Sequence, residues 1–173
     1  IVWVGIDMDS QYGLVKEVTK AVEKEVGVEN SNFTLPMHVS LKISFSVEER
    51  DFQAVEDVIT AIYDRTKPFE ISVEGIELHE NICWIRMKEN PRLNALSEEL
   101  NYTLRDKFGV PLHEYDLDFK FHTTLFMDDD TEKVAKAYEK VKDISVPDKL
   151  VASRFVIGTS ESGDLGTYKI YKT

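Results

Sequence analysis

The chain has 173 residues, of which 42% are hydrophobic and 31% are charged, and its formal net charge at pH 7 is −11. This balance is typical of a soluble globular domain, and no apolar run approaches the roughly 18 residues of a membrane span, so we expect no membrane association. A negative net charge repels long DNA or RNA, so a small anionic ligand or an oligonucleotide end fits better, although solubility alone explains the acidity equally well.

The first half of the chain alternates between strand and helix patterns. Apolar residues, Leu14 among them, recur at helical spacing over Gln11–Val26, and Gly27 follows as a typical helix end. Apolar and polar residues alternate strictly over Met37–Phe45, which predicts a strand. The predicted elements of this half are strands over Ile1–Asp7, Met37–Phe45, Phe69–Leu78 and Ile82–Lys88, and helices over Gln11–Val26 and Glu48–Arg65.

The second half continues this alternation. Pro91 is a typical first helical residue, Gly109 is a typical helix end, and Thr131 is a plausible N-cap. The predicted elements are helices over Pro91–Phe108 and Thr131–Lys142, a strand over Phe119–Met127, and a closing hairpin of Lys149–Ser160 and Gly166–Tyr171 around Glu161–Leu165.

The second half also repeats the first. The segment VEKEVGV at 22–28 resembles LRDKFGV at 104–110, and a histidine-bearing strand follows each of them. The glycines Gly27 and Gly109 are 82 residues apart, and His38 and His122 are 84 residues apart. An approximate duplication predicts an α+β fold in which two pseudo-symmetric lobes, about 1–78 and 82–173, form one domain around a central cleft.

Each half has one histidine strand. Because successive strand side chains point to opposite faces, the predicted polar faces are His38, Ser40, Lys42 and Ser44 in the first strand, and Lys120, His122, Thr124 and Phe126 in the second. In each strand the imidazole and the hydroxyl two residues later lie about 7 Å apart on one face. One such pair is ordinary on a half-exposed strand, but its recurrence at equivalent places favours a functional site.

Two histidines facing each other are suited to phosphodiester chemistry. Opening a cyclic phosphodiester needs a base that deprotonates water on one side of phosphorus and an acid that protonates the leaving ribose oxygen on the other. Imidazole, with an ordinary pKa of about 6.5, serves either role near neutral pH. Ser40 and Thr124 then donate hydrogen bonds to the phosphate oxygens. None of these roles requires a metal.

At these residues the sequence resembles the two-histidine (2H) phosphoesterase superfamily, which includes 2′-5′ RNA ligase-like proteins and cyclic phosphodiesterases. That family has two His-x-Thr/Ser-x motifs, which here are His38-Val39-Ser40-Leu41 and His122-Thr123-Thr124-Leu125. The resemblance covers nearly the whole chain and implies a bilobal, LigT-like fold with no required cofactor. It also implies hydrolysis or ligation at 2′,3′-cyclic or 2′-5′ nucleotide linkages. Ser40 stands where many members carry threonine, and both residues supply a hydroxyl.

Two further residues are candidates for substrate binding. Lys120, on the same predicted face as His122, would hold a phosphate, and Tyr168 in the last strand would stack on a base. An exposed surface lysine and a packing tyrosine are the alternatives. Trp84 and Arg86 share a strand face and are candidates for lining the cleft, although packing is the simpler role for Trp84.

The remaining chemically interesting residues fit ordinary roles. The acidic run Asp128–Asp130 lacks a complete calcium-loop pattern and fits a solvated helix start. His79 and His113 have no second ligand at helical spacing and are expected in loops. Cys83 is the only cysteine, so we expect inert packing, no disulfide and a reducing, cytoplasmic location.

We therefore expect a monomeric, metal-independent phosphoesterase that acts on a cyclic nucleotide phosphate or a short 2′-5′ linked oligonucleotide. Its catalytic residues are predicted to be His38, Ser40, His122 and Thr124. One alternative is a binding module that uses the same cleft for a nucleotide or RNA without catalysis. Another is a pair of ferredoxin-like RNA-binding lobes, which would carry exposed aromatic residues and basic surroundings on its central strands.

Overall fold

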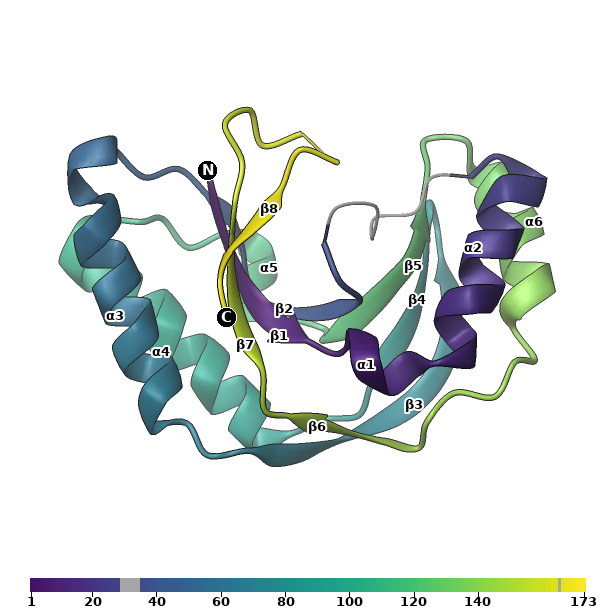
Figure 1. Cartoon of the computed structure of the whole chain (residues 1–173), viewed down its shortest axis with the longest axis horizontal. Helices are drawn as coiled ribbons and strands as arrows, with labels where there is room; N and C mark the ends of the chain where they lie inside the picture. Colours follow the sequence, from purple (N-terminus) through teal and green to yellow (C-terminus); the bar gives the residue numbers. More distant parts are fainter. Residues whose placement is uncertain (29–34, 165) are drawn as a thin grey trace.

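The computed structural model describes residues 1–28, 35–164 and 166–173, and these form two four-stranded antiparallel sheets (Figure 1). The first sheet has the strand order β2-β1-β7-β8 and the second has the order β5-β4-β3-β6. The strands are β1 (Val2–Asp7), β2 (His38–Phe45), β3 (Phe69–His79), β4 (Ile82–Met87), β5 (His122–Met127), β6 (Lys149–Ala152), β7 (Phe155–Thr159) and β8 (Lys169–Lys172). The predicted α+β class is confirmed.

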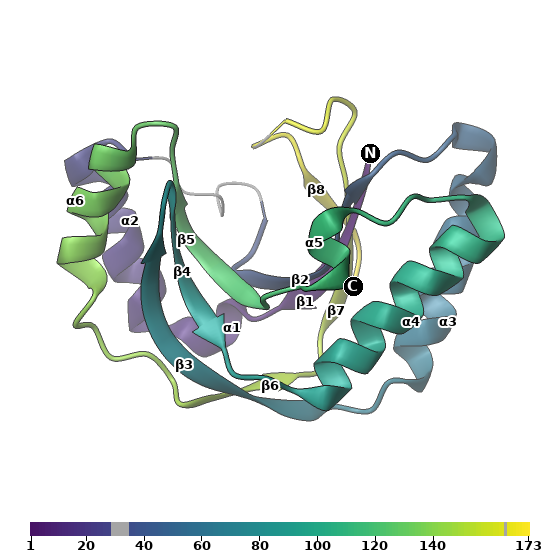
Figure 2. The same cartoon turned by 180° about the vertical axis from the view of Figure 1, so that it is seen from behind.

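Helices cover the outer side of each sheet. Helices α3 and α4 pack together against the first sheet, and α2 and α6 pack together against the second, so the pairs lie at opposite ends of the molecule (Figures 1 and 2). The helices are α1 (Asp9–Tyr12), α2 (Leu14–Val26), α3 (Phe52–Arg65), α4 (Pro91–Phe108), α5 (Glu114–Leu117) and α6 (Thr131–Val141), with a 3-10 turn η1 (Glu49–Asp51). Within the described residues, every helix is too short or too polar to cross a membrane.

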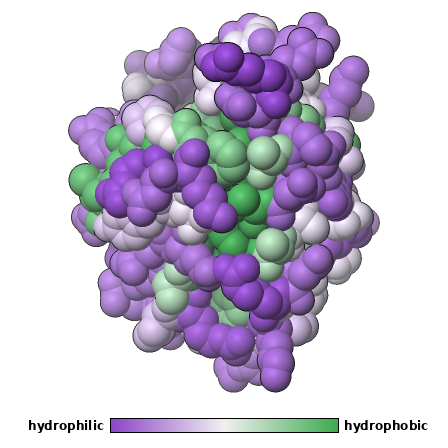
Figure 3. Space-filling view, turned by 90° about the vertical axis from the view of Figure 1, so that its left-hand side faces the viewer, coloured by the Kyte–Doolittle hydropathy of each residue, from purple (hydrophilic) through white to green (hydrophobic). Residues whose placement is uncertain are grey.

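Helices α3 and α4 are amphipathic, with a mostly polar outer face and an apolar inner face. Figure 3 shows this end of the molecule covered mostly by hydrophilic residues, with hydrophobic residues visible near its middle and at its left edge. The inward residues of these helices, such as Ile59 and Leu100, are completely buried in the main core. Burial of one apolar face per helix therefore holds the helices to the sheets.

Both sheets combine strands from the two halves of the chain. The predicted single strand over Lys149–Ser160 is in fact two strands, because the chain crosses between sheets at Ser153 and Arg154. Strand β6 pairs with β3, whereas β7 pairs with β1. The sheets therefore do not follow the contiguous ranges 1–78 and 82–173 that the repeat suggested, since the first half contributes β3 to the second sheet and the second half contributes β7 and β8 to the first.

The predicted helix ends are largely correct. Gly27 and Gly109 both adopt the left-handed conformation that ends a helix, with φ of 70° and 68°, as expected for equivalent positions of a repeat. Asn90 caps α4, with Pro91 as its first residue. The expected cap of α6, Thr131, is wrong, because the Asp130 carboxylate accepts the terminal N–H groups instead.

The first predicted helix is broken in two. Gly13, with φ of 43°, separates α1 from α2, so the helix direction changes there. Leu14, which the apolar pattern placed inward, is 64% exposed as a result. A single helix over Gln11–Val26 was therefore the wrong prediction, although Val15 and Val22 are buried as expected.

Both histidine strands contain an irregularity that the alternation did not reveal. The register shifts against β1 beyond Ser40 and against β4 beyond Thr124, which is the signature of a β-bulge. Lys42 and Phe126, both predicted on the polar face, are therefore completely buried beside a buried leucine. The two residues hold equivalent positions, four residues after each histidine.

A short helix stands before the second histidine strand. Helix α5 lies in a segment that no pattern marked, and Phe119–Phe121 is outside β5, so the predicted strand over Phe119–Met127 is three residues shorter. Lys42 donates to the Pro111 carbonyl at 3.1 Å and pairs with the Asp116 carboxylate, whose side chain is completely buried. This buried ion pair ties α5 to β2.

Candidate active site

The two histidines begin the two edge strands that meet at the centre of the molecule. His38 is the first residue of β2 and His122 is the first residue of β5, and these two strands contact each other (Figure 1). Both imidazoles are half-buried. A charge on His122 lowers the pKa of His38, so the two rings interact electrostatically. The structure therefore brings together the two histidines that the repeat predicted to be equivalent.

Each imidazole is held by the same backbone contact. Nδ1 of His38 lies 2.7 Å from the Pro36 carbonyl oxygen, and Nδ1 of His122 lies 2.6 Å from the Lys120 carbonyl oxygen. A carbonyl oxygen only accepts, so Nδ1 must carry the proton in both rings. In the neutral form, Nε2 of each histidine is therefore the nitrogen with a free lone pair for proton transfer.

Each imidazole also packs against a tryptophan from the neighbouring strand. Trp3 of β1 contacts His38 with ring centroids 4.5 Å apart, and Trp84 of β4 contacts His122 at 4.3 Å. Trp84 also stacks on His79, with ring centroids 5.3 Å apart. Backbone and aromatic contacts together restrict the rotation of both imidazoles, which acid–base catalysis requires.

The two hydroxyls lie two residues further along their strands and are half-buried like the histidines. Ser40 Oγ accepts a hydrogen bond of 2.9 Å from Nε1 of Trp3. Thr124 lies directly opposite Trp84 in the β4–β5 register. The bulges come after both hydroxyls, so they leave each histidine and its hydroxyl on one face of the strand.

The charges next to the two histidines are opposite in sign. Asp7 faces His38 in the β1–β2 register, and Arg86 faces His122 in the β4–β5 register. Asp7 forms an ion pair with Arg154 at 3.1 Å, and Arg86 forms one with Glu77 at 3.4 Å. The pseudo-symmetric site is therefore electrostatically asymmetric.

Burial lowers the pKa of both imidazoles. It lowers the pKa of His38 to about 4, against an opposing effect of the Pro36 hydrogen bond and of the Asp7 charge. It also lowers the pKa of His122, against the opposing hydrogen bond to Lys120. The cause is the loss of water around a group that would become charged. Both rings are therefore mainly neutral at pH 7 in the free protein.

The two residues predicted to bind substrate are not where the sequence placed them. Lys120 lies before β5 rather than within it, with an exposed side chain, and contributes its carbonyl to His122. Tyr168 precedes β8 and is only 6% exposed. Its hydroxyl hydrogen-bonds Ser44 Oγ at 2.6 Å, and its ring belongs to a small apolar cluster with Trp3. Tyr168 thus packs beside Trp3, whose indole contacts His38 and Ser40.

Other residues that the sequence singled out have structural roles outside the histidine pair. Asp130 caps a helix and His113 caps α5. Burial raises the pKa of the Cys83 thiol to about 12, as expected for inert packing. Among the described residues, no group of three or more His, Cys, Asp or Glu side chains is placed to hold a metal ion.

The sequence reasoning missed Trp3 as a site residue. A tryptophan in the N-terminal strand is usually a packing residue, and nothing in the spacing linked it to a histidine 35 positions later. The available signal was its alternation with Gly5 and Asp7, which places all three on one face of the strand. That face is the one next to His38 and Ser40.

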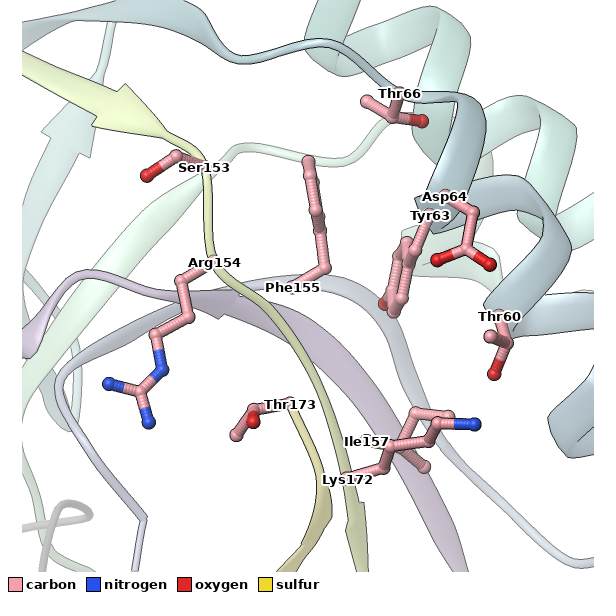
Figure 4. A pocket seen from close by; sticks show the side chains of 10 residues that line it. All are labelled: Thr60, Tyr63, Asp64, Thr66, Ser153, Arg154, Phe155, Ile157, Lys172 and Thr173. Atoms are coloured by element: carbon pink, nitrogen blue, oxygen red, sulfur yellow. The ribbon is translucent and has the colours of Figure 1, made fainter.

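A separate cavity of about 300 Å³ lies between α3 and the strands β7 and β8 (Figure 4). Tyr63 stacks on Phe155 at its wall, and the buried hydroxyls of Tyr63 and Thr60 have no hydrogen-bond partner. Unpaired hydroxyls in a polar cavity of this size suit ordered water. None of the six predicted site residues lines this cavity.

Comparison with protein families identifies a superfamily for this chain. The family model of the 2′-5′ RNA ligase superfamily matches residues 30–163. No curated protein sequence matches the chain.

Comparison with solved structures gives matches over the whole fold. The crystal structure of E. coli LigT complexed with phosphate has a TM-score of 0.57 and 15% identity, covering 99% of this chain and 93% of that one. E. coli LigT complexed with 3′-AMP has a TM-score of 0.56 and 14% identity, with coverage of 99% and 94%. A crystal structure described as a phosphoesterase has the same four values. At these identities the likeness establishes the fold.

Proposed function

Because the chain belongs to the 2′-5′ RNA ligase superfamily, whose enzymes are 2H phosphoesterases, we propose that it hydrolyses a 2′,3′-cyclic nucleotide phosphate or a short 2′-5′ linked oligonucleotide. The observation that supports this most is the pair of imidazoles, each with Nδ1 bonded to a carbonyl and Nε2 left for proton transfer. A purely structural histidine gains nothing from a free Nε2 at equivalent places in both halves.

The proposed reaction uses one imidazole as base and the other as acid. Nε2 of the base removes a proton from water, whose oxygen attacks phosphorus. The bond from phosphorus to one ribose oxygen breaks, and Nε2 of the acid protonates that oxygen. The product is a nucleoside monophosphate, and one proton has passed from one imidazole to the other. Ser40 and Thr124 donate to the phosphate oxygens as negative charge grows in the transition state.

A small substrate suits the surroundings of the pair. The net charge of −11 disfavours a long polyanion, and Arg86, which lies opposite His122 in the β4–β5 register, already pairs with Glu77. LigT, which shares this fold, has been crystallised with phosphate and with 3′-AMP, so a nucleotide phosphate is the natural first probe. We propose that the protein acts as a monomer on such a ligand, with Lys120 and Tyr168 at the periphery of its site.

The test is a product-resolved assay on a panel of 2′,3′-cyclic nucleotides and 2′-5′ linked dinucleotides. Conversion of at least one substrate, slowed by roughly 10²-fold or more in the His38→Ala and His122→Ala variants, is the expected result. A wild-type protein that binds these nucleotides tightly and converts none of them would indicate the binding-module alternative. Salt-sensitive binding of long RNA without conversion would indicate an RNA-binding protein.

Activity is expected to survive removal of divalent cations. The two histidines supply base and acid, and the two hydroxyls supply donors, so the proposed steps contain no role for a metal. Turnover of a 2′,3′-cyclic nucleotide should be equal with and without excess EDTA. Loss of turnover that Mg²⁺, Mn²⁺ or Zn²⁺ restores would show that the histidines are ligands rather than proton-transfer groups.

The pH dependence of kcat/KM should be bell-shaped with its maximum below pH 6.5. The productive form has one neutral and one protonated imidazole, and it is most populated between the two pKa values. The pKa of His38 is about 4, and that of His122 lies below its usual value of 6.5. Raising the pH above this interval removes the acid's proton, and lowering it protonates the base.

Steady-state kinetics from about pH 4 to about pH 8.5 measure this profile, with circular dichroism as a check that the fold persists. A bound phosphate anion stabilises an imidazolium, so the profile of kcat should lie at higher pH than that of kcat/KM. A kcat/KM that keeps rising to about pH 8.5 would contradict the lowered pKa values.

A further inference from the structure

Trp3 touches both residues of the first histidine motif. Its ring lies against the His38 imidazole with centroids 4.5 Å apart and an interplanar angle of 68°, and its Nε1 donates to Ser40 Oγ at 2.9 Å. The side chain is 4% exposed, so the indole is fixed by its surroundings. A single buried side chain thus links the imidazole and the hydroxyl that lie two residues apart on β2.

Two glycines make room for this indole. A Cβ atom on Gly5 would lie 2.3 Å from Cζ2 of Trp3, and one on Gly158 would lie 2.9 Å from Cε3, both too close for real atoms. Gly5 is the residue directly opposite Ser40 in the register. Trp3, two positions away, therefore extends across Gly5 to reach the histidine motif. The absence of side chains at Gly5 and Gly158 therefore leaves the space through which the indole reaches His38.

The hydrogen bond determines how Ser40 can act. An indole N–H is only a donor, whereas a hydroxyl has one donor proton and two acceptor lone pairs. When Ser40 Oγ accepts from Trp3, its own proton stays available for another acceptor, such as a phosphate oxygen. We propose that Trp3 is a positioning residue that fixes Ser40 as a hydrogen-bond donor to the substrate phosphate and holds the His38 ring beside it. This inference rests on the proposed function.

Trp84 provides a matched control within the same chain. It packs against His122 at 4.3 Å, as Trp3 packs against His38, but its Nε1 donates to Glu77 at 3.4 Å. Replacing either tryptophan with phenylalanine keeps an aromatic ring and removes the N–H. Only Trp3→Phe removes a hydrogen bond to Ser40. The effect of this substitution on phosphate binding should therefore depend on the Ser40 hydroxyl, and the effect of Trp84→Phe should not.

The experiment is a double-mutant cycle on the binding of inorganic phosphate, measured by calorimetry on the full chain. Trp3→Phe and Ser40→Ala should each weaken phosphate binding roughly 10- to 100-fold, as expected for one hydrogen bond to an anion. The double variant should bind no more weakly than Ser40→Ala alone, because both substitutions remove the same interaction. Trp84→Phe combined with Ser40→Ala should instead weaken phosphate binding by the product of the two single-variant factors.

A second measurement tests the contact without phosphate. In a ¹⁵N NMR spectrum, Ser40→Ala should move the indole N–H resonance of Trp3 and leave that of Trp84 in place. Wild-type affinity for phosphate in Trp3→Phe, or an unmoved Trp3 resonance, would overturn the positioning role and leave the proposed function standing. A wild-type protein that neither binds phosphate nor converts any substrate on the panel would overturn both.

Discussion

Replacing His38 or His122 with alanine is expected to lower kcat by roughly 10²- to 10⁴-fold, because each imidazole performs a proton transfer that its partner cannot perform. Both rings have Nδ1 bonded to a carbonyl, so only Nε2 of each ring is left for proton transfer. The measurement is kcat on whichever panel substrate the wild type converts.

The double variant should be little slower than the more impaired single variant. Base and acid act in one reaction, and groups that act as a unit have non-additive effects on kcat. Ser40→Ala and Thr124→Ala should give smaller but clear losses, because each removes one donor to the phosphate.

The matched control is His113→Asn. This substitution also removes an imidazole, while asparagine retains an acceptor suited to the N-cap of α5. Its kcat should be close to that of the wild type. A His122→Ala protein with nearly normal kcat on every substrate would refute the two-histidine mechanism and favour the binding-module interpretation.

Lys42→Met should destabilise the fold by about 3–5 kcal/mol, because it leaves a buried carboxylate without its cation. The side chains of Lys42 and Asp116 are 2% and 0% exposed; Lys42 pairs with Oδ2 of Asp116, and Oδ1 has no hydrogen-bond partner. The size of the methionine side chain is not the difficulty, since Phe126 fills the equivalent buried position in the other half. Urea unfolding followed by circular dichroism measures the change.

Two further variants separate charge from packing. Lys42→Met combined with Asp116→Asn removes both charges and keeps an acceptor for the His113 N–H, so it should recover most of the lost stability. Lys149→Met removes a lysine from the exposed pair with Glu70, and no measurable change is expected there. An equal loss of stability in Lys42→Met and in its combination with Asp116→Asn would show that packing of the lysine stem, rather than the unpaired charge of Asp116, is responsible.

This ion pair also matters for the site, because it connects the first histidine strand to the segment that leads into the second. Lys42 lies on β2 four residues after His38, and Asp116 lies on α5 in the segment that leads into His122. A Lys42→Met protein that remains folded should therefore have a lower kcat than its fraction of folded protein explains, because the position of the second imidazole is less restricted.

Much of this protein could be inferred from its sequence, because the signals are local and occur twice. Helix ends at Gly27 and Gly109, the strand patterns and the recurrence of His-x-Ser/Thr depend on backbone preferences and on the two-residue period of a strand. These properties hold wherever the segment lies in the fold. They were sufficient to predict the α+β class and the equivalence of His38 and His122.

Tertiary structure alone decided which residues surround the two histidines. The crossing at Ser153 and Arg154, and the bulges that bury Lys42 and Phe126, depend on which strand pairs with which and in what register. Local pattern carries no information about pairing, because a strand can present the same face to different neighbours. Trp3 reaches His38 only because β1 pairs with β2 and because Gly5 leaves its path open. The candidate catalytic residues could thus be predicted from the sequence, whereas the residues that hold them in place were determined by contacts between distant segments.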